Sequence, residues 1–282
     1  MGLFGRERIE TKTDDQIVAM RAAGLVVGRC LAMCQEQVRD GMSTGELDAY
    51  AETFIRDHGA VPSFLGYHGF TGSLCTSVNE EVVHGIPGVR VLRDGDLLSI
   101  DCGAILQGWH GDAAISMIVG GREAGRAEDL ALIDATEDSM WAGIAALAVG
   151  QPLYAVGAAV EDSIDSAGEH DEREYGIVED YVGHGIGREM HMDPQVPNYR
   201  VSGRGPRVTS GTTVAIEPMI TLGPADTHVL EDEWTVVTAS GRRAAHWENT
   251  VACTDRGLWV LTALDGGQQR LDAAGAGFGP LG

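Results

Sequence analysis

The sequence predicts a duplicated fold, in which a unit of two helices followed by strands occurs once in each half of the 282-residue chain. Two observations indicate the duplication. Each half contains a pair of amphipathic helix patterns ahead of its strands. In addition, Gly95 to Asp101 and Gly211 to Glu217 share one layout, a glycine followed six residues later by a carboxylate that comes after isoleucine. A twofold relation between the halves would bring Asp101 and Glu217 to opposite sides of one shared site, where ligand pockets commonly form.

The first half begins with two helices whose starts are marked by capping boxes. Thr13 to Gln16 forms the first box, and apolar residues at helical spacing then predict a long helix that ends at Gly41. Ser43 to Glu46 forms the second box, ahead of a helix that ends at Gly59. The elements expected next are a loop rich in glycine and aromatic residues over 59–73 and short strands at 74–78 and 82–83.

A β-hairpin follows and carries two aspartates inside apolar runs. A Gln-Gly turn at 107–108 joins the runs, and with a two-residue loop the strand partners sum to 215. Asp101 then opposes Ala114, and Asp112 opposes Gly103, so that the aspartates are diagonal neighbours about 7–8 Å apart on one face. A solvated hairpin with incidental acids is the alternative. Two anions this close favour a raised pKa or a bound cation, and Gly103 leaves room between them.

The second half repeats the order of helices and then strands. Glu123 to Leu147 predicts a third helix, and Pro152 fits the first turn of a fourth helix that ends at Gly168. His184 follows between two glycines, in the segment 183–187. From Gly266 the composition turns to glycine, alanine and glutamine without periodicity, which predicts a tail without fixed structure. The strands expected in this half are 212–217, 227–230, 234–238 and 246–253.

Composition and charge exclude several classes of protein. The formal net charge of −22 would repel phosphate backbones and argues against direct binding of nucleic acid. It would mildly attract a cationic substrate such as a free amino terminus, although solubility alone is a sufficient explanation. No apolar run approaches the roughly 18 residues that span a bilayer, and the first residues lack the apolar core of a secretory signal. Five cysteines without a Cys-x-x-Cys pair predict neither a disulfide framework nor a zinc ribbon, so we expect a cytoplasmic protein.

Four acidic residues occupy strand positions where an unpaired charge is costly. They are Asp101, Asp112, Glu217 and Glu248. Four carboxylates in one core need cations, and His184 could add one nitrogen ligand. This mostly oxygen-rich set suits a pair of divalent ions of the manganese, iron or cobalt kind better than a thiolate zinc site. Two ions about 3.5–4 Å apart can share a bridging hydroxide, which is the nucleophile of metal-assisted hydrolysis.

A family resemblance rests on motifs distributed over most of the chain. In order along the sequence, between about Thr13 and Val260, they are His84-Gly85-Ile86-Pro87, Ser99-Ile100-Asp101-Cys102-Gly103, Gly111-Asp112-Ala113-Ala114, Gly183-His184-Gly185-Ile186-Gly187, His191, Ile216-Glu217-Pro218-Met219 and Glu248-Asn249-Thr250. These motifs and their spacing strongly resemble type I methionine aminopeptidase, a member of the pita-bread metallopeptidases. The chain lacks the N-terminal zinc-finger or proline-rich extension of some relatives and the long insertion of type II enzymes.

The resemblance implies the α+β pita-bread fold, which has two pseudo-twofold-related halves of helices packed on an antiparallel curved sheet. It implies two divalent ions, of manganese, iron, cobalt or zinc. Asp101 would bind one ion, Asp112 and Glu248 would bridge both, and His184 and Glu217 would hold the other. We expect three segments: an N-terminal arm over 1–12, a single catalytic domain over 13–265 and the glycine-rich tail over 266–282.

The implied reaction removes the initiator methionine of a nascent protein or peptide when the second residue is small. The bridging hydroxide would attack the carbonyl, Glu217 would move the proton, and His84 and His191 would contact the substrate amide. The implied methionine pocket uses Tyr67, Phe70, Cys75 and Trp234, with His68 near its mouth. Phe64 and Met190 differ from the usual side chains, which leaves the pocket's shape open. We expect action on chains at the ribosome, without direct nucleic-acid or membrane binding, by a monomer.

Two alternatives remain at this stage. One is another pita-bread hydrolase, such as a proline dipeptidase or a Pro-specific aminopeptidase, although these usually carry a separate N-terminal domain. The other is a non-catalytic binding protein on the same fold, although such proteins generally lose metal ligands. The relative rates on Met-Ala-Ser, Ala-Pro and Met-Pro peptides distinguish the first alternative, and metal-dependent release of methionine distinguishes the second.

Overall fold

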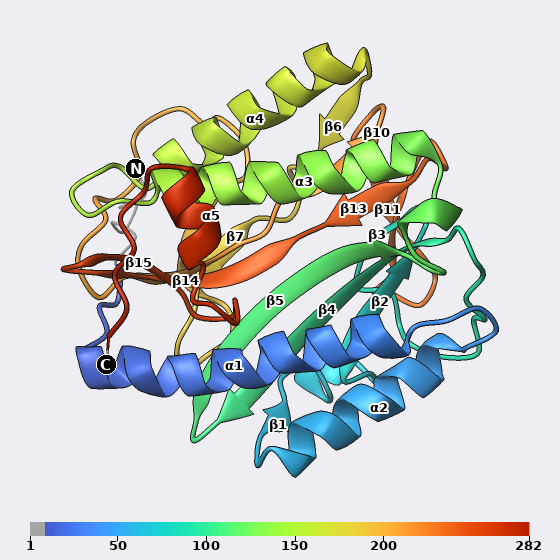
Figure 1. Cartoon of the computed structure of the whole chain (residues 1–282), viewed down its shortest axis with the longest axis horizontal. Helices are drawn as coiled ribbons and strands as arrows, with labels where there is room; N and C mark the ends of the chain where they lie inside the picture. Colours follow the sequence, from blue (N-terminus) through green and yellow to red (C-terminus); the bar gives the residue numbers. More distant parts are fainter. Residues whose placement is uncertain (1–8, 282) are drawn as a thin grey trace, which may run out of the picture.

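The structure is a computed structural model that describes residues 9–281 (Figure 1). The helices are α1 (Asp14–Gln37), α2 (Thr44–Asp57), α3 (Ala127–Ala146), α4 (Ala155–Asp171) and α5 (Gln268–Ala273), with 3₁₀ turns at Tyr67–Gly69 and Arg122–Ala124. The strands of the first half are β1 (Val61–Pro62), β2 (Leu74–Val78), β3 (Glu81–Val83), β4 (Leu97–Leu106) and β5 (Trp109–Ile118). Those of the second half are β6 (Tyr175–Ile177), β7 (Gly183–Gly185), β8 (Met192–Val196), β9 (Thr213–Ile216), β10 (Met219–Leu222), β11 (Thr227–Val229), β12 (Val236–Thr238), β13 (Ala244–His246), β14 (Glu248–Thr254) and β15 (Gly257–Val260).

A nine-stranded antiparallel sheet runs through both halves of the chain. Its order is β1-β4-β5-β14-β9-β7-β8, with β2 paired to β4 and β15 paired to β14. The contact between β5 and β14 joins the halves, because β5 belongs to the first and β14 to the second. Two small three-stranded sheets, β13-β10-β6 and β11-β12-β3, flank the main sheet. The sheet therefore places strands from distant parts of the sequence side by side at the centre of the fold.

Each half covers its strands with a pair of helices, as the duplication predicts. The first core cluster packs α1 and α2 against β4, with fully buried Leu47, Ile55 and Ile100. The second packs α3 and α4 against β9 and β14, with fully buried Val156 and Val251. In Figure 1, α1 and α3 lie across the same face of the sheet, one over each half. The opposite face is left for the site.

The two predicted capping boxes form and start the first two helices. The Thr13 side chain accepts a hydrogen bond from the Gln16 N–H, and the Gln16 side chain accepts one from the Thr13 N–H. Ser43 and Glu46 make the same reciprocal pair at the start of α2. Such boxes satisfy backbone donors that a helix start leaves without partners.

α1 is, within residues 9–281, the one helix that is long and apolar enough by length and composition to cross a membrane. This differs from the expectation that the chain has no such segment. In the structure α1 is a core helix, and half of its apolar window is buried. Arg21 on this helix is only 9 % exposed, and its guanidinium donates to the carbonyls of Val260 and Leu261 at 3.2 and 2.7 Å. A buried arginine with these partners ties α1 to the chain after β15.

Glycine permits the close approach of α1 to its neighbours. A Cβ atom at Gly24 would lie 2.2 Å from the carbonyl oxygen of Leu261. We expect Gly24→Ala to lower the free energy of unfolding by about 1–3 kcal/mol through overpacking, although alanine is the better helix former. Ala22→Ser, at an exposed position of the same helix, should change it by less than about 0.5 kcal/mol. Urea denaturation measures both, and equal stability of the two variants would contradict this account of the contact.

The tail is ordered from Gly266 to Leu281, contrary to the prediction. It contains α5, and Leu271 is fully buried in the second core cluster. Phe278 forms a β-bridge with Leu258 and packs against the same cluster. These contacts are made with residues distant in sequence, so composition and periodicity gave no sign of them. The expected N-terminal arm over 1–12 falls mostly on residues 1–8, which lie outside the described residues, while Thr11 pairs with Thr212.

Candidate metal centre and active site

The predicted hairpin forms in the predicted register. Asp101 on β4 opposes Ala114 on β5, and Gly103 opposes Asp112. The aspartates therefore lie on one face, as expected from the two-residue turn. The space over Gly103 differs from the prediction, because a Cβ atom there would lie 2.8 Å from both Phe64 Cε1 and Ser63 Cβ. The glycine thus makes room for the loop that carries Phe64 rather than for an ion.

β14 brings a third carboxylate into line with the hairpin. Ala114 opposes Asp101 on one side and Glu248 on the other, so the three residues form a row across β4, β5 and β14. Residues in such a row point to the same face of the sheet. Asp112, two residues before Ala114, shares that face because side chains alternate along a strand. Sheet pairing alone therefore gathers Asp101, Asp112 and Glu248 on the face opposite the helices.

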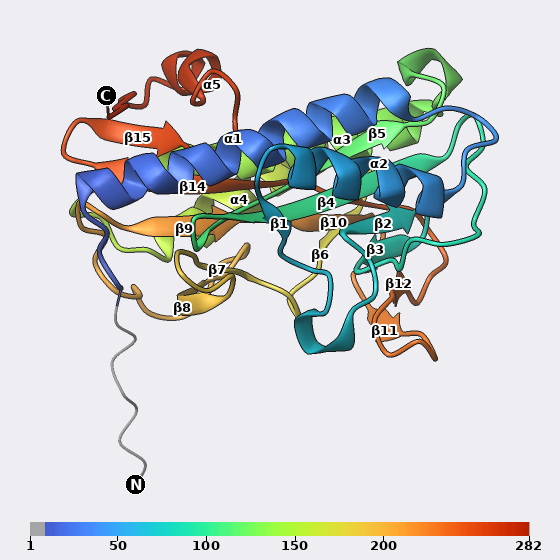
Figure 2. The same ribbon diagram turned by 90° about the horizontal axis from the view of Figure 1, so that it is seen from below.

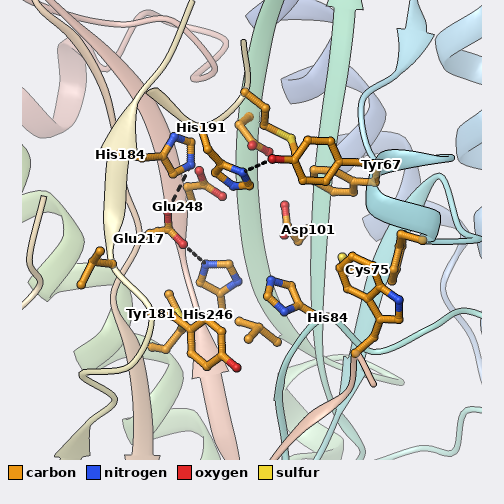
Figure 3. A pocket seen from close by; sticks show the side chains of 18 residues that line it. Tyr67, Cys75, His84, Asp101, Tyr181, His184, His191, Glu217, His246 and Glu248 are labelled. Carbon is orange, nitrogen blue, oxygen red and sulfur yellow. Dashed lines mark hydrogen bonds and ion pairs between the residues drawn. The ribbon is translucent and has the colours of Figure 1, made fainter. Parts of the chain in front are cut away.

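The second half contributes His184 on β7 and Glu217, which directly follows β9. Glu217 Oε1 lies 3.3 Å from His184 Nε2, and its Oε2 lies 4.0 Å from His246 Nε2 (Figure 3). Single ligand atoms of Asp112, His184 and Glu248 all lie within 4.8 Å of one another. The structure thus brings together all five side chains that the sequence analysis predicted as metal ligands, and all five line one cavity of about 220 Å³.

Hydrogen bonding at this cluster is incomplete in the way that a cation site requires. Asp101 Oδ1, Asp112 Oδ1 and Glu248 Oε1 are buried without a hydrogen-bond partner. Nδ1 of His184 lies 2.9 Å from the Gly185 carbonyl, which only accepts, so Nδ1 carries the proton and Nε2 is a lone pair. That lone pair faces the Glu217 carboxylate, an arrangement that repels unless a cation lies between the two groups. The residues present therefore fit divalent metal ions.

Electrostatics lead to the same conclusion. Burial raises the pKa of Asp101 to about 7. Burial, with added repulsion from neighbouring carboxylates, raises the pKa values of Asp112, Glu217 and Glu248 well above their ordinary range. Burial also lowers the pKa of His184 to about 3, which keeps its imidazole neutral at neutral pH. Several buried carboxylates with a neutral imidazole ligand cannot all ionise without compensating positive charge.

The two histidines predicted to contact substrate lie at the same cavity. His84 has a positive φ of 59° and stands edge-on to Tyr181, with ring centroids 5.4 Å apart. Burial lowers the pKa of His84 to about 4. His191 Nδ1 lies 2.9 Å from the Tyr67 hydroxyl, and its ring centroid is 4.4 Å from that of His184. If the Tyr67 hydroxyl donates to Nδ1, the Nε2–H of His191 is free to donate elsewhere.

The residues predicted to form a methionine pocket lie together beside the predicted metal ligands. Phe64, Phe70, Cys75 and Met190 make one buried cluster, against which Tyr67 and Trp234 pack. Phe70 and Trp234 stand edge-on with ring centroids 5.1 Å apart. Burial raises the pKa of Cys75 well above its ordinary value, so the thiol stays protonated where it lines the cavity. His68 is not among the residues that line the cavity, although its ring contacts that of Tyr67 at 4.4 Å.

Five residues that line the cavity were not among the predicted site residues: Val83, Tyr181, Val182, Met219 and His246. His246 is 2 % exposed, and its Nε2 is buried without a hydrogen-bond partner. A signal for His246 was present, because it comes two residues before Glu248 and alternation along an extended chain puts both on one face. Tyr181 lies in a loop, where no periodicity indicates the direction of a side chain.

Trp234 gives a direct test of the pocket. We expect Trp234→Ala to lower kcat/KM for a methionine peptide by about tenfold or more, mainly through KM, because an apolar contact with the bound side chain is lost. Trp234 is only partly buried, so the fold should tolerate the change. Tyr50→Ala, which truncates an aromatic residue that is 46 % exposed on α2, is the matched control. Steady-state kinetics that show the same KM for both variants would remove Trp234 from the pocket.

Comparison with known proteins agrees with this geometry. Residues 18–255 match metallopeptidase family M24. Methionine aminopeptidase 1 of Mycobacterium tuberculosis is 51 % identical over 261 residues, which cover 92 % of this chain and 97 % of that protein. The crystal structure of methionine aminopeptidase from Thermotoga maritima superposes with a TM-score of 0.85 at 36 % identity, covering 91 % of this chain and all of that one.

The comparisons also separate this chain from a second group on the same fold. Prolidase from Pyrococcus furiosus superposes with a TM-score of 0.67 at 19 % identity, and the match covers only 65 % of that chain. This likeness is one of fold, and it confirms the predicted α+β pita-bread architecture. The 51 % identity to the Mycobacterium tuberculosis protein, over 92 % of this chain and 97 % of that protein, shows the family as well as the fold. The chain belongs to metallopeptidase family M24 and, within it, to the methionine aminopeptidases.

Proposed function

We propose that this chain removes the N-terminal methionine from peptides and nascent proteins whose second residue is small. The observation that carries the proposal is the convergence of five metal-ligand side chains beside an apolar, sulfur-containing and aromatic pocket in one cavity. A flexible, polarisable methionine side chain suits walls made of Phe70, Cys75, Met190 and Trp234. The family assignment supports the same activity.

We propose that two divalent ions, of manganese, iron, cobalt or zinc, are held by the five ligands. Asp101 would bind one ion and His184 with Glu217 the other, while Asp112 and Glu248 would contact both. The buried oxygens of Asp101, Asp112 and Glu248 that lack partners support this assignment. Such ions, when bound, lower the pKa of water towards neutrality and polarise a carbonyl group. The ligand set is rich in oxygen, which suits manganese and iron in particular.

The chain's own residues would bind the peptide and move protons. Glu217, 14 % exposed at the cavity, is within reach of a water in the site and would carry its proton to the leaving amine. His191 would donate from Nε2 to the oxygen on which charge develops, with Tyr67 holding its ring through Nδ1. His84 is neutral at pH 7, because burial lowers its pKa to about 4, and would contact the scissile amide without adding charge.

We infer a monomeric cytoplasmic protein that meets its substrates at the ribosome. The five cysteines support a reducing compartment, because all are buried and none is paired. The net charge of −22 opposes direct contact with RNA, so docking would involve protein or the nascent chain itself. Sedimentation of the purified chain tests the oligomeric state, and co-sedimentation with ribosomes that carry a nascent chain tests the location of its action.

The test of the proposed function compares three peptides with purified protein supplied in turn with manganese, cobalt and iron. We expect methionine release from Met-Ala-Ser and little cleavage of Ala-Pro or Met-Pro. Faster cleavage of the proline peptides would favour the other hydrolases of this fold. A protein inert with every metal and peptide would favour a binding role.

A further inference from the structure

On three loops, six acidic residues directly precede in sequence a residue that lines the cavity. We call them the acidic rim: Glu179 and Asp180 before Tyr181, Glu189 before Met190, and Glu231, Asp232 and Glu233 before Trp234. All six side chains are exposed to solvent. The proposed mechanism uses none of them, and each of the three loops also carries a residue that lines the cavity.

The three loops belong to one surface. Asp180 lies within 3.5 Å of the Thr227 hydroxyl on β11, which joins the first loop to the β11–β12 hairpin. Glu189 acts on Tyr67, a residue from the other half of the chain: burial raises the pKa of the Tyr67 hydroxyl, and the charge of Glu189 adds to the rise. Figure 2 shows β7 and β8, and further along β11 and β12, on the side of the sheet opposite α1.

The charge of the rim is not neutralised within the protein. None of the six carboxylates forms an ion pair with a lysine or arginine of the described residues 9–281. Arg188 is next to Glu189 in sequence, but its guanidinium stacks on Trp109 at 4.0 Å and donates to the Gln107 and Gly108 carbonyls. Asp232 has a structural task as well, because Oδ1 accepts from the backbone N–H groups of Trp234 and Thr235.

The cavity that these three loops help to line is itself a candidate binding site. Asp112 and Glu248 in the cavity are only 4 % and 3 % exposed, and each has a buried oxygen without a partner. A substrate bound there by its first residue must leave the cavity past the rim. An extended peptide advances about 3.3 Å per residue, so its third to fifth residues would lie within roughly one Debye length of the rim at ordinary salt.

We propose that the acidic rim selects substrates by charge. It favours chains with lysine or arginine at the third to fifth positions and disfavours chains with aspartate or glutamate there. This inference rests on the proposed function, since it concerns the part of the peptide that follows the removed methionine. A cleft lined by one sign of charge raises the local concentration of oppositely charged ligands and repels like charges.

The first test compares three peptide amides with a common start: Met-Ala-Lys-Lys-Ser, Met-Ala-Ser-Ser-Ser and Met-Ala-Glu-Glu-Ser. At low ionic strength we expect kcat/KM for the basic peptide to exceed that for the acidic one by about tenfold, mainly through KM. At about 0.5 M salt the ratio should fall towards one, because screening shortens the reach of exposed charges to a few ångströms. The neutral peptide should lie between the two.

The second test removes charge from the rim and, separately, from a distant surface. The rim variant combines Asp180→Asn, Glu189→Gln, Glu231→Gln and Glu233→Gln, and it keeps Asp232 because that residue holds Trp234. The control combines Glu36→Gln, Asp57→Asn, Asp165→Asn and Glu169→Gln, which are exposed, unpaired positions on α1, α2 and α4. We expect the rim variant to lose most of the basic-to-acidic ratio, and the control, with the same change in net charge, to keep it.

The outcomes distinguish this inference from the proposed function. Methionine release at equal rates from the basic and acidic peptides would overturn the inference and leave the proposed function intact. Equal loss of the ratio in both variants would also overturn it, since net charge and not the rim would then select substrates. No methionine release from any peptide, with Met-Ala-Ser included, would overturn the proposed function itself.

Discussion

Glu217→Gln is expected to yield a folded protein that has lost about 10²–10⁴-fold in kcat on Met-Ala-Ser, measured at saturating metal. The amide matches the carboxylate in shape, so packing around this residue is kept. It can neither accept a proton nor supply the negative charge that faces His184 Nε2 at 3.3 Å. The loss should appear in kcat and in kcat/KM alike, because the proton transfer occurs only in the reaction itself.

Two controls accompany this variant. Metal content after gel filtration distinguishes a lost proton carrier from a lost ligand, since weaker metal binding would show as lower occupancy. Glu169→Gln, at an exposed position on α4, removes one charge without touching the cavity and should keep the full rate. Wild-type turnover by Glu217→Gln with the metal bound would exclude Glu217 from proton transfer.

Asp101→Asn is expected to stabilise the metal-free protein and to weaken the metal-loaded one. Burial raises the pKa of Asp101 to about 7 in the folded chain, compared with an ordinary value of 3.8. Because the folded pKa is the higher one, the charged form is disfavoured by folding. The ionisation of Asp101 therefore lowers the free energy of unfolding of the wild type. This loss is absent below about pH 4, grows as the pH rises to about 7, and is constant above that.

The difference between the two proteins reports the ionisation of Asp101 together with the repulsion that its charge exerts on Asp112, Glu217 and Glu248. The neighbouring histidines titrate in both proteins and cancel in the comparison. In chelator, the free energy of unfolding of Asp101→Asn should exceed that of the wild type by about 2–4 kcal/mol at pH 8 and by close to zero at pH 4. Urea denaturation across this range measures the gap, with Asp165→Asn as an exposed control. A gap independent of pH would mean that Asp101 is not disfavoured as an anion.

The central hairpin and the set of candidate metal ligands could be predicted from the sequence, and the reason is physical. A two-residue turn fixes the register of an antiparallel pair, and that register determined which face Asp101 and Asp112 share. Acids inside apolar strand patterns indicated cations, because an unpaired buried charge is too costly to keep. The same reasoning applied to Glu217 and Glu248, since both stand at the ends of buried strands.

The parts that could not be predicted depend on contacts between distant residues. The sequence of the tail shows no periodicity, yet Leu271 belongs to the second core cluster and Phe278 packs against it. No local pattern indicates these contacts. The short strands β10 and β13 are only 4 and 3 residues long, which is too short for alternation to stand out from noise. The fourth helix begins at Ala155, beyond Pro152, and continues to Asp171 past Gly168. Gly168 allows a close approach at this helix end, because a Cβ atom there would lie 3.0 Å from the Arg173 carbonyl oxygen.

The acidic rim illustrates a different limit. Its six residues are visible in the sequence, but they belong to three separate loops, and only the fold assembles them around one cavity. From the sequence, the charge could therefore be interpreted only as a whole, as a source of solubility or of a mild attraction for cationic substrates. The structure adds the location of that charge. Because the charge lies beside the cavity, it leads to a testable preference for substrates.

Methionine release from Met-Ala-Ser by protein stripped with a chelator and then titrated with manganese tests the central claim most directly. We predict no release from the stripped protein, recovery of release as manganese is added, and no recovery in Asp112→Asn, whose buried carboxylate lies among the ligand atoms. Full release by stripped protein shown by elemental analysis to hold no metal would contradict the claim that these side chains act by holding divalent ions.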